Sequence, residues 1–498
     1  MFTSCNQTSA SATAYKHHHV YAYKRPKVFA YVHFDIDALI SLASKLRGKS
    51  CTVDMSMRPK AGSTHWVIFI IFEDGVEWVF RSPRSGLSAI IADESASKLL
   101  TSEASTLKYL RNLGSMPVPE VFSFRRVSKQ RPVLHMTDHD REKIMEQLGT
   151  IMSQLLDIHF DKIGSLFQDS NGNYFVGECL SPSLLWQHRD ELEGIDRGPF
   201  DRESQYLRSL ISAFTAHAEE LPLRPHSFFA PIPDPFKYPN WTSYRKAVER
   251  WQTFCSIGGK VEGNKNRLDF CIAGQFLSEM VPYLASPEEN FVLCHPDLHL
   301  GNIFVDDDFN ITCIIDWSSA AASPTAELLS TPGLNGSLSP PKPSFIAAFR
   351  SRFCNGSQTL GPQLWERADK MWYFLRLVQM LSTQDDTLFK SLYDLVYNRN
   401  SDDIPRLFHE RSMPESGQAI FAKLCEGEPE EEEDKATQKD NDNDQTNVSV
   451  EVVVARKLTL MSEMNTNFVA GKRLWLWMRT PWKHWMYNLL PYRYTSCC

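Results

Sequence analysis

The sequence predicts an α+β fold, in which a β-rich amino-terminal part precedes a larger, mostly helical part. Two pairs of apolar segments joined by short polar turns predict β-hairpins, one over residues 66–81 and one over residues 303–315. Between the hairpins, apolar residues recur every three or four positions in several segments, which is the spacing of amphipathic helices. The 498 residues are 42% hydrophobic, which suffices for a sizeable core and for more than one ordinary domain.

The elements of the amino-terminal part can be assigned in order. A helix is expected over residues 36–46, because apolar side chains lie on one face and a glycine follows as a stop. The first hairpin pairs residues 66–72 with residues 76–81 across a Glu-Asp-Gly turn. Helical spacing then continues over residues 96–110, and Gly114 ends that helix.

The segments between the hairpins predict helices that pack against a core. Their apolar residues keep helical spacing over residues 144–156, 206–214, 241–254 and 268–284. After the second hairpin, residues 323–345 are rich in Pro, Ser and Gly, and they predict a long loop, which could border a pocket.

The densest group of chemically capable side chains lies in residues 295–302, which read His-Pro-Asp-Leu-His-Leu-Gly-Asn, and in Asp316. Asp297 and Asn302 are five positions apart in a predicted loop, where Gly301 lets the backbone bend back without a side-chain clash. The second hairpin would return Asp316 to the mouth of the same loop. All three side chains can then face one cleft.

This combination favours phosphoryl transfer. An ionised carboxylate such as Asp297 can orient an incoming hydroxyl and accept its proton late. Asn302 and Asp316 supply carboxamide and carboxylate oxygens, which are the donors that Mg²⁺ prefers. We expect His295 to support the loop by hydrogen bonding. The alternative is an acidic surface loop, an interpretation that we accept for the turn residues 306–308.

The stretch 291–329, which contains HPDLHLGNIFVDDDFNITCIIDW, resembles the aminoglycoside phosphotransferase and choline-kinase-like superfamily, in particular its fungal branch. The resemblance covers most of residues 30–420. Four further segments are similar to that branch in order and wording, namely residues 34–48, 58–84, 102–121 and 160–168.

The resemblance implies a protein-kinase-like two-lobed fold, ATP and Mg²⁺ as cofactors, and transfer of the γ-phosphate to a hydroxyl group of a small molecule. It implies that Asp297 is the catalytic base and that Asn302 and Asp316 are the metal ligands.

Nucleotide-binding residues follow from the same resemblance. Kinases place a cation on the second hairpin strand, where it contacts phosphates and pairs with a glutamate of the next helix. Arg81 and Glu103 match these positions, with arginine in place of the usual lysine. The alternative is an exposed strand-edge arginine and a solvated glutamate. Backbone amides of Gly62, Ser63 and Thr64 could meet phosphate oxygens, although an ordinary strand connection fits them equally well.

Residues 125–140 depart from the family pattern. A kinase-like amino-terminal lobe should contribute two more strands and an adenine-binding hinge here, and strands take about 5–6 residues each. The sixteen residues, RRVSKQRPVLHMTDHD, are mostly polar and lack the apolar run of such a strand. Either the lobe is shortened after residue 124 and binds nucleotide poorly, or the sequence omits an exon.

Composition divides the chain and limits its partners. Residues 426–444 carry a net charge of −8, which leaves +1 for the rest of a chain whose total is −7. A nearly neutral body offers no basic face for nucleic acid. The predicted parts are a disordered arm (1–30), a kinase-like amino-terminal lobe (31–140), a carboxy-terminal lobe with a helical insert and the catalytic loop 291–317 (141–425), an acidic disordered linker (426–447) and an aromatic, basic tail (448–498).

Eleven cysteines without a Cys-x-x-Cys framework, and the lack of any apolar run approaching eighteen residues, predict a soluble cytoplasmic protein. In the tail, alternating basic and tryptophan side chains over residues 472–494 suit a weak contact with a membrane or a partner. The terminal Cys497-Cys498 weakly resembles a prenylation site, and an unselected read-through tail explains it equally well.

Three functions remain open from the sequence. The leading one is an ATP- and Mg²⁺-dependent kinase of a small molecule. The second is a catalytically impaired kinase-fold binding module, which the short segment after residue 124 favours. The third is a metallohydrolase, because His295, Asp297 and His299 alternate and could share one face of an extended segment.

Overall fold

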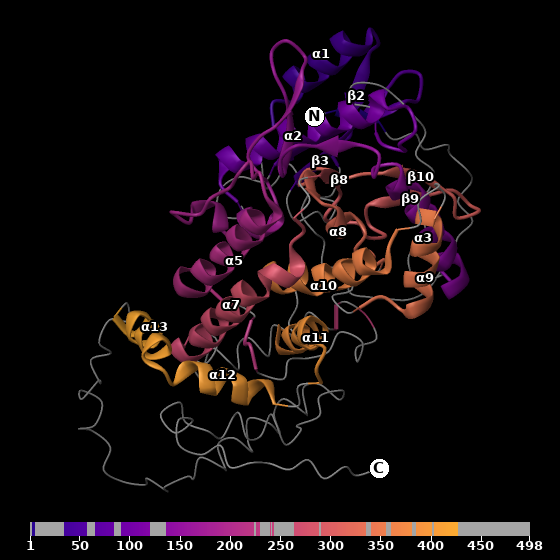
Figure 1. Cartoon of the computed structure of the whole chain (residues 1–498). Helices are drawn as coiled ribbons and strands as arrows, with labels where there is room; N and C mark the ends of the chain where they lie inside the picture. The colour runs from indigo at the N-terminus through magenta and orange to yellow at the C-terminus, as the bar shows by residue number, and fades with distance from the viewer. Residues whose placement is uncertain are drawn as a thin grey trace, which may run out of the picture. The chain divides into compact units, whose positions relative to one another are not determined.

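Figure 1 shows the computed structural model of the chain. The chain divides into two compact units: unit 1 comprises Met1–Ala213 and Val281–Leu375, and unit 2 comprises Phe214–Met280 and Arg376–Cys498. The residues that the structure describes are 2–4, 34–56, 65–83, 91–119, 136–223, 226–229, 240, 242–243, 263–287, 290–334, 340–354, 360–380, 385–400 and 403–426.

Unit 1 begins with a small β-rich lobe. Its helices, α1 (Ile36–Arg47) and α2 (Asp93–Asn112), confirm the two predicted there, and α1 ends at a left-handed glycine. The β3–β4 hairpin is also confirmed, and it turns at Gly75, whose φ of +75° suits glycine. The four strands form an antiparallel sheet, in pairing order β1 (Phe2–Ser4), β4 (Glu77–Pro83), β3 (His65–Phe72) and β2 (Cys51–Val53).

The amino-terminal predictions can be compared with the structure only in part. Phe2–Ser4 pair with β4 as a strand, so these three residues depart from the predicted disordered arm over residues 1–30. The rest of that arm lies outside the described residues, as do most of the shortened segment 125–140, the acidic linker and the tail. The described chain resumes at residue 136, and α3 (Asp138–Ser153) begins at a capping box formed by Thr137 and Asp140.

A five-stranded sheet carries the predicted catalytic loop. Strand β8 pairs with β11 in antiparallel fashion, with Cys294 opposite Ala321, so the loop leaves and re-enters the sheet at neighbouring positions. Between these strands, β9 (Ile303–Val305) and β10 (Ile311–Ile314) form the second hairpin, as predicted. In pairing order the sheet contains β5 (His159–Phe160), β8 (Phe291–Cys294), β11 (Ala321–Pro324), β6 (Gly164–Gln168) and β7 (Tyr174–Val176).

The long loop predicted over residues 323–345 was wrong in part. Residues 323–324 complete β11, and α8 (Thr325–Leu328) and the start of α9 (Pro343–Ser351) also fall within that range. The strand was missed because its small residues lack the β-branched pattern of a typical strand. Its partners on both sides, β8 and β6, provide the backbone hydrogen bonds that stabilise it.

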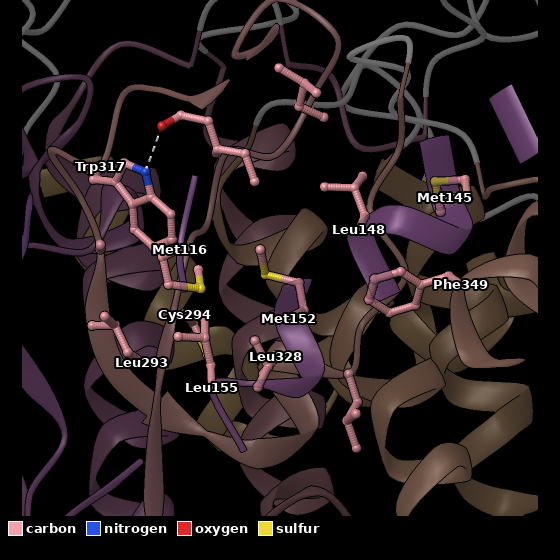
Figure 2. Packing of buried hydrophobic residues seen from close by; sticks show 14 of the residues in the cluster. Met116, Met145, Leu148, Met152, Leu155, Leu293, Cys294, Trp317, Leu328 and Phe349 are labelled. Atoms are coloured by element: carbon pink, nitrogen blue, oxygen red, sulfur yellow. Dashed lines mark hydrogen bonds between the residues drawn. The ribbon is translucent and has the colours of Figure 1, made fainter. Parts of the chain in front are cut away.

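The main core of unit 1 lies beneath the loop. Helices α3 and α9 lie side by side (Figure 1), and a side chain at Gly149 would collide with the backbone carbonyl of Phe349. Figure 2 shows Leu148, Met152 and Phe349 packed with residues of β8. The other short elements described in this unit are α4 (Pro182–Leu185) and the 3₁₀ turns η4 (Arg189–Glu191) and η6 (Arg352–Cys354).

Unit 2 is helical. Its aromatic core includes Phe228 and Phe276, whose rings each lie tilted against Phe408, and Phe389, which packs edge-on against Phe276. Helices α5 (Glu203–Glu220), α7 (Asn264–Leu284) and α10 (Pro362–Val378) each contribute residues to both units, and α11 (Asp385–Tyr397), α12 (Ile404–Ser412) and α13 (Glu415–Glu426) belong to unit 2 alone.

Three of the four helices predicted between the hairpins are thus confirmed, as α3, α5 and α7. The fourth, over residues 241–254, lies almost wholly outside the described residues. The fold is α+β, with a small β-rich amino-terminal lobe and a larger helical carboxy-terminal lobe. Within the described ranges, no helix combines the length and apolar character that a membrane span requires.

Candidate active site

His295 anchors the start of the loop. Its ring Nε2 donates to the carbonyl of Ile315 at 2.9 Å, and its Nδ1 accepts the backbone N–H of Asp297 at 3.2 Å. The ring also packs edge-on against Trp317, with 4.7 Å between ring centroids. Burial lowers the pKa of His295, which keeps the ring neutral. This is the supporting role expected for His295.

Asn302 links Asp297 to the second hairpin. Its side-chain Nδ2 donates to the backbone carbonyl of Asp297 at 2.9 Å and lies 3.4 Å from the carboxylate Oδ2 of the same residue. The carbonyl of Asn302 accepts the N–H of Ile315 at 2.9 Å. With its amide hydrogens turned toward Asp297, the buried side chain keeps its amide oxygen for another partner.

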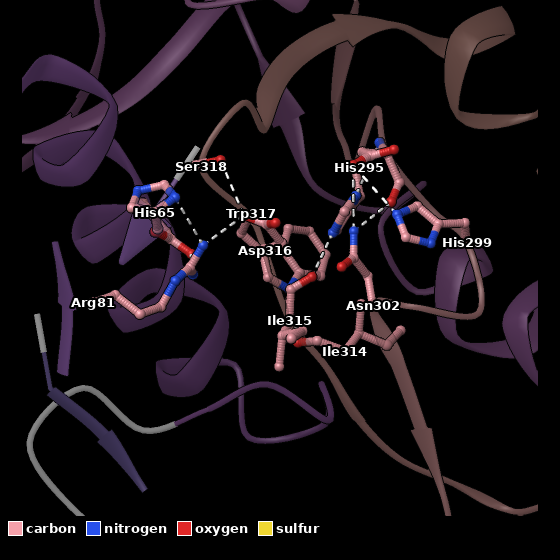
Figure 3. A network of polar contacts seen from close by, with 12 residues as sticks. His65, Arg81, His295, His299, Asn302, Ile314, Ile315, Asp316, Trp317 and Ser318 are labelled. Carbon is pink, nitrogen blue, oxygen red and sulfur yellow. Dashed lines mark hydrogen bonds and ion pairs between the residues drawn. The ribbon is translucent and has the colours of Figure 1, made fainter. Parts of the chain in front are cut away.

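Asp316 lies where β10 ends and has a φ of +66°, a conformation that is uncommon outside glycine. The following Trp317 fixes this bend, because its fully buried indole donates to the carbonyl of Ile314 at 3.0 Å. The Oδ1 atom of Asp316 accepts from Arg81 at 2.9 Å and from the Ser318 hydroxyl at 3.2 Å. Figure 3 shows Asp316 between Arg81 and the His295 side of the loop.

Arg81 joins two carboxylates. Its Nη1 lies 2.7 Å from Oε1 of Glu103 on α2, while its Nη2 reaches Asp316. The Arg81 side chain is 14% exposed and that of Glu103 is 1% exposed, so neither is the solvated surface group of the alternative interpretation. Burial alone would lower the pKa of Arg81, but the two carboxylates raise it.

The electrostatics keep both loop carboxylates ionised. Burial raises the pKa of Asp316, but Arg81 more than offsets this, and the pKa lies below its ordinary value. Burial also raises the pKa of Asp297, and the imidazoles of His299 and His295 bring it below its ordinary value. Both groups are therefore available as bases or metal ligands at neutral pH.

The sequence analysis missed His65. Its Nδ1 lies 3.4 Å from Nη2 of Arg81, and burial together with Arg81 lowers the pKa of His65 to about 4. In the hairpin register Val67 lies opposite Arg81. Residues two apart share a face of a strand, so His65 is the diagonal neighbour of Arg81, and this register was the available signal. The predicted phosphate-contacting residues Gly62, Ser63 and Thr64 lie outside the described residues.

The donor set suits Mg²⁺. The amide oxygen of Asn302 and the Oδ2 atom of Asp316 are hard oxygen donors, and Mg²⁺ commonly takes only one or two protein ligands beside phosphates and water. Zinc does not suit the loop, because both ring nitrogens of His295 already have protein partners. Across the described residues, no group of three or more His, Cys, Asp and Glu side chains could hold a metal ion.

Residues 58–331 match the family described as the phosphotransferase enzyme family, abbreviated APH. The match spans more than half of the chain, and the chain therefore belongs to this family. The resemblance read from the motifs is confirmed at this level, and nothing in the comparisons assigns the chain to a fungal branch. No curated protein matched the chain.

Solved structures of several kinases align loosely with the chain. A Thermobifida fusca protein assigned as a fructosamine-3-kinase aligns with a TM-score of 0.40 and 15% identity, covering 73% of this chain and 98% of that one. A macrolide 2'-phosphotransferase from Brachybacterium faecium gives 0.35 and 16%, with 79% and 99% coverage. A Plasmodium vivax ethanolamine kinase gives 0.31 and 14%, with 76% and 82% coverage. The assignment to the family rests on the match of residues 58–331.

Proposed function

We propose that the protein is an ATP- and Mg²⁺-dependent kinase that transfers the γ-phosphate to a hydroxyl group of a small molecule. The observation that carries the proposal is the joining of Asp297, Asn302 and Asp316 by one short set of contacts. Asn302 donates to Asp297 through its side chain and accepts from Ile315, the neighbour of Asp316, through its backbone. Family membership supports the same reaction class.

Asp297 would act on the acceptor. Its carboxylate orients the hydroxyl and takes its proton as the hydroxyl oxygen bonds to the γ-phosphorus, while the bond between that phosphorus and the bridging oxygen breaks and ADP leaves. Because its pKa lies below its ordinary value, Asp297 is a weak base and acts mainly by aiming the nucleophile. Its side chain is 46% exposed, so an acceptor can approach it.

Asn302 and Asp316 would hold Mg²⁺, which screens the charge of the phosphates when it is bound. Arg81 would contact the phosphates, as the corresponding cation does in kinases. Glu103 fixes the Arg81 guanidinium from its other side. These assignments place one cation and two oxygen ligands around the nucleotide, with the base on the acceptor side.

Mg²⁺-dependent ATP hydrolysis, with water as the acceptor, tests the proposal without knowledge of the substrate. Asp297→Asn should lower kcat by about 10²- to 10⁴-fold and leave ATP affinity, measured by calorimetry, nearly unchanged. Asp316→Ala should remove the effect of Mg²⁺ on ATP binding. The matched control is Asp308→Asn, the same change at an exposed turn position of the second hairpin. Equal turnover by Asp297→Asn and the wild-type chain would contradict the role of the base.

A further inference from the structure

His299 is a side chain of the loop to which the proposed reaction gives no role. The backbone N–H of Gly301 donates to its ring Nδ1 at 2.9 Å. The ring also covers Gly301 so closely that a Cβ on this residue would lie 2.8 Å from Nδ1. Gly301 has no left-handed φ, so its glycine serves here to leave room for the ring of His299 and gives no special backbone freedom.

The accepted hydrogen bond fixes the tautomer of His299. Because Nδ1 accepts from Gly301, a neutral ring carries its proton on Nε2. That atom lies 3.6 Å from Oδ2 of Asp297. This separation is longer than a hydrogen bond, so the contact is electrostatic in the free protein, and such contacts often tighten when substrate binds.

Two loop donors therefore face the same oxygen of Asp297. Nδ2 of Asn302 lies 3.4 Å from Oδ2, and Nε2 of His299 approaches it as well. Within the described part of the chain, no donor lies against Oδ1. Figure 3 shows the His299 and Asn302 side chains extending toward the same point of the loop. The χ2 torsion of an aspartate, which turns its carboxylate, has only weak preferences of its own. Contacts to one carboxylate oxygen and not to the other are therefore needed to hold the Asp297 carboxylate in one orientation.

We propose that His299 is a positioning residue, which holds Oδ2 of Asp297 so that Oδ1 faces the acceptor hydroxyl and receives its proton. This inference rests on the proposed kinase function. The His299 side chain is 33% exposed, so it adds little to the core and its replacement should leave the fold intact. The ring acts through Asp297 and does not itself exchange a proton with the substrate.

Turnover of Mg-ATP by the full chain, with water as the acceptor, tests the positioning role. His299→Leu should lower kcat by about 10- to 100-fold with KM for ATP unchanged, because a misplaced base affects only the chemical step. His299→Gln should recover most of the loss, since its amide oxygen can accept from Gly301 and its amide nitrogen can donate to Asp297.

A double-mutant cycle separates this role from general support of the loop. If His299 acts through Asp297, His299→Leu should cause no further loss in an Asp297→Asn background. A loss of the same factor in both backgrounds would overturn the proposal. So would an unchanged kcat in His299→Leu.

Nitrogen NMR of the histidine-labelled full chain tests the geometry independently of activity. The ring signals, assigned by their loss in His299→Gln, should show Nε2 protonated and Nδ1 unprotonated near neutral pH. Asp297→Asn should shift the Nε2 signal, and the control Asp308→Asn should not. A proton on Nδ1, or no response to Asp297→Asn, would overturn the inference. If the spectra agree but the wild-type chain does not turn over ATP, the kinase proposal fails and the contact to Asp297 stands.

Discussion

At the scale of single residues, arginine at position 81 has a consequence that lysine would not share. Its planar fork reaches Glu103 with one nitrogen and Asp316 with the other. A lysine has a single ammonium nitrogen and cannot match this spread. The guanidinium therefore holds a proposed metal ligand in place, and at the same time it donates to one oxygen of a fully buried glutamate.

Replacing Arg81 should destabilise unit 1. Arg81→Met leaves the Glu103 carboxylate buried without its cation, and breaking a buried pair in this way costs about 3–5 kcal/mol. Arg81→Lys should lose less, because it keeps the charge and one of the contacts. Urea unfolding followed by circular dichroism should show the highest midpoint for the wild-type chain, a lower one for Arg81→Lys and the lowest for Arg81→Met.

The matched control for Arg81 removes both partners. Arg81→Met combined with Glu103→Leu removes the fully buried carboxylate together with its cation and leaves only the more exposed Asp316 without Arg81, so it should recover much of the midpoint that Arg81→Met loses. If Arg81→Met unfolds at the wild-type midpoint, the pair does not carry the stability that its burial implies.

The sequence could predict which loop residues gather, because a loop followed by a hairpin limits where Asp297, Asn302 and Asp316 can go. It could not predict which atoms meet. The shared contacts to Oδ2 of Asp297 depend on the orientation of the His299 ring, which is set by its hydrogen bond to the N–H of Gly301 and by its packing against that glycine. The contact of His65 with Arg81 depends on a strand register that sequence spacing alone does not define.

At the scale of elements, local signals predicted well and non-local pairing did not. Helix α1 has a capping Asp35 and a terminal glycine, and the β3–β4 hairpin has a three-residue polar turn, so both are determined by neighbouring residues. Strands β5 and β11 are short, and each pairs with β8 across more than twenty residues of chain. Strands of this kind form because their partner strands supply the backbone hydrogen bonds, which no signal in the neighbouring sequence predicts.

Helix α8 contains a buried carboxyl group that belongs to neither proposal. Glu327 accepts a hydrogen bond from the hydroxyl of Tyr206, on α5, at 3.3 Å. Ser323 also bonds to it, and Glu203 adds repulsion. Burial, the largest cause, raises the pKa of Glu327 to about 7. The group is therefore largely protonated in the folded chain under mildly acidic conditions, in which an exposed glutamate is ionised.

The raised pKa of Glu327 predicts a pH dependence of stability. Between about pH 4.5 and pH 7 the folded chain holds a proton that the unfolded chain has lost, so the free energy of unfolding falls as pH rises through this window. The total contribution is roughly 3 kcal/mol, and it is fully present below the unfolded pKa. Glu327→Gln keeps a hydrogen-bond acceptor for Tyr206 and removes this dependence.

Melting temperatures of the wild-type chain and Glu327→Gln, measured from pH 5 to pH 8, check the prediction. The melting temperature of Glu327→Gln should rise relative to that of the wild type as pH increases, and most of this change should occur below about pH 7. A difference between the two chains that stays constant over this range would show that Glu327 has an ordinary pKa in the folded state.

At the scale of the whole molecule, the region that matches the family ends earlier in the chain than the described helices do. The match ends at residue 331, whereas described helices continue to Glu426. Within unit 2, Phe276 of α7 lies in the matched region and packs against Phe389 and Phe408, which lie beyond it. Arg411 on α12 pairs with Glu279 on α7 at 2.5 Å. Unit 2 is therefore built from both regions.

Truncation should reveal this difference. A chain ending at Thr331 would expose the aromatic face of α7, at about 1.5–3 kcal/mol for each uncovered phenylalanine, and should aggregate. A chain ending at Glu426 retains every described helix and removes only the acidic linker and the aromatic, basic tail, so it should stay soluble and melt near the temperature of the full chain. Size-exclusion chromatography and thermal melts distinguish these outcomes. A folded monomer ending at Thr331 would show that the later helices are dispensable, and insolubility of the chain ending at Glu426 would mean that residues beyond it belong to the core.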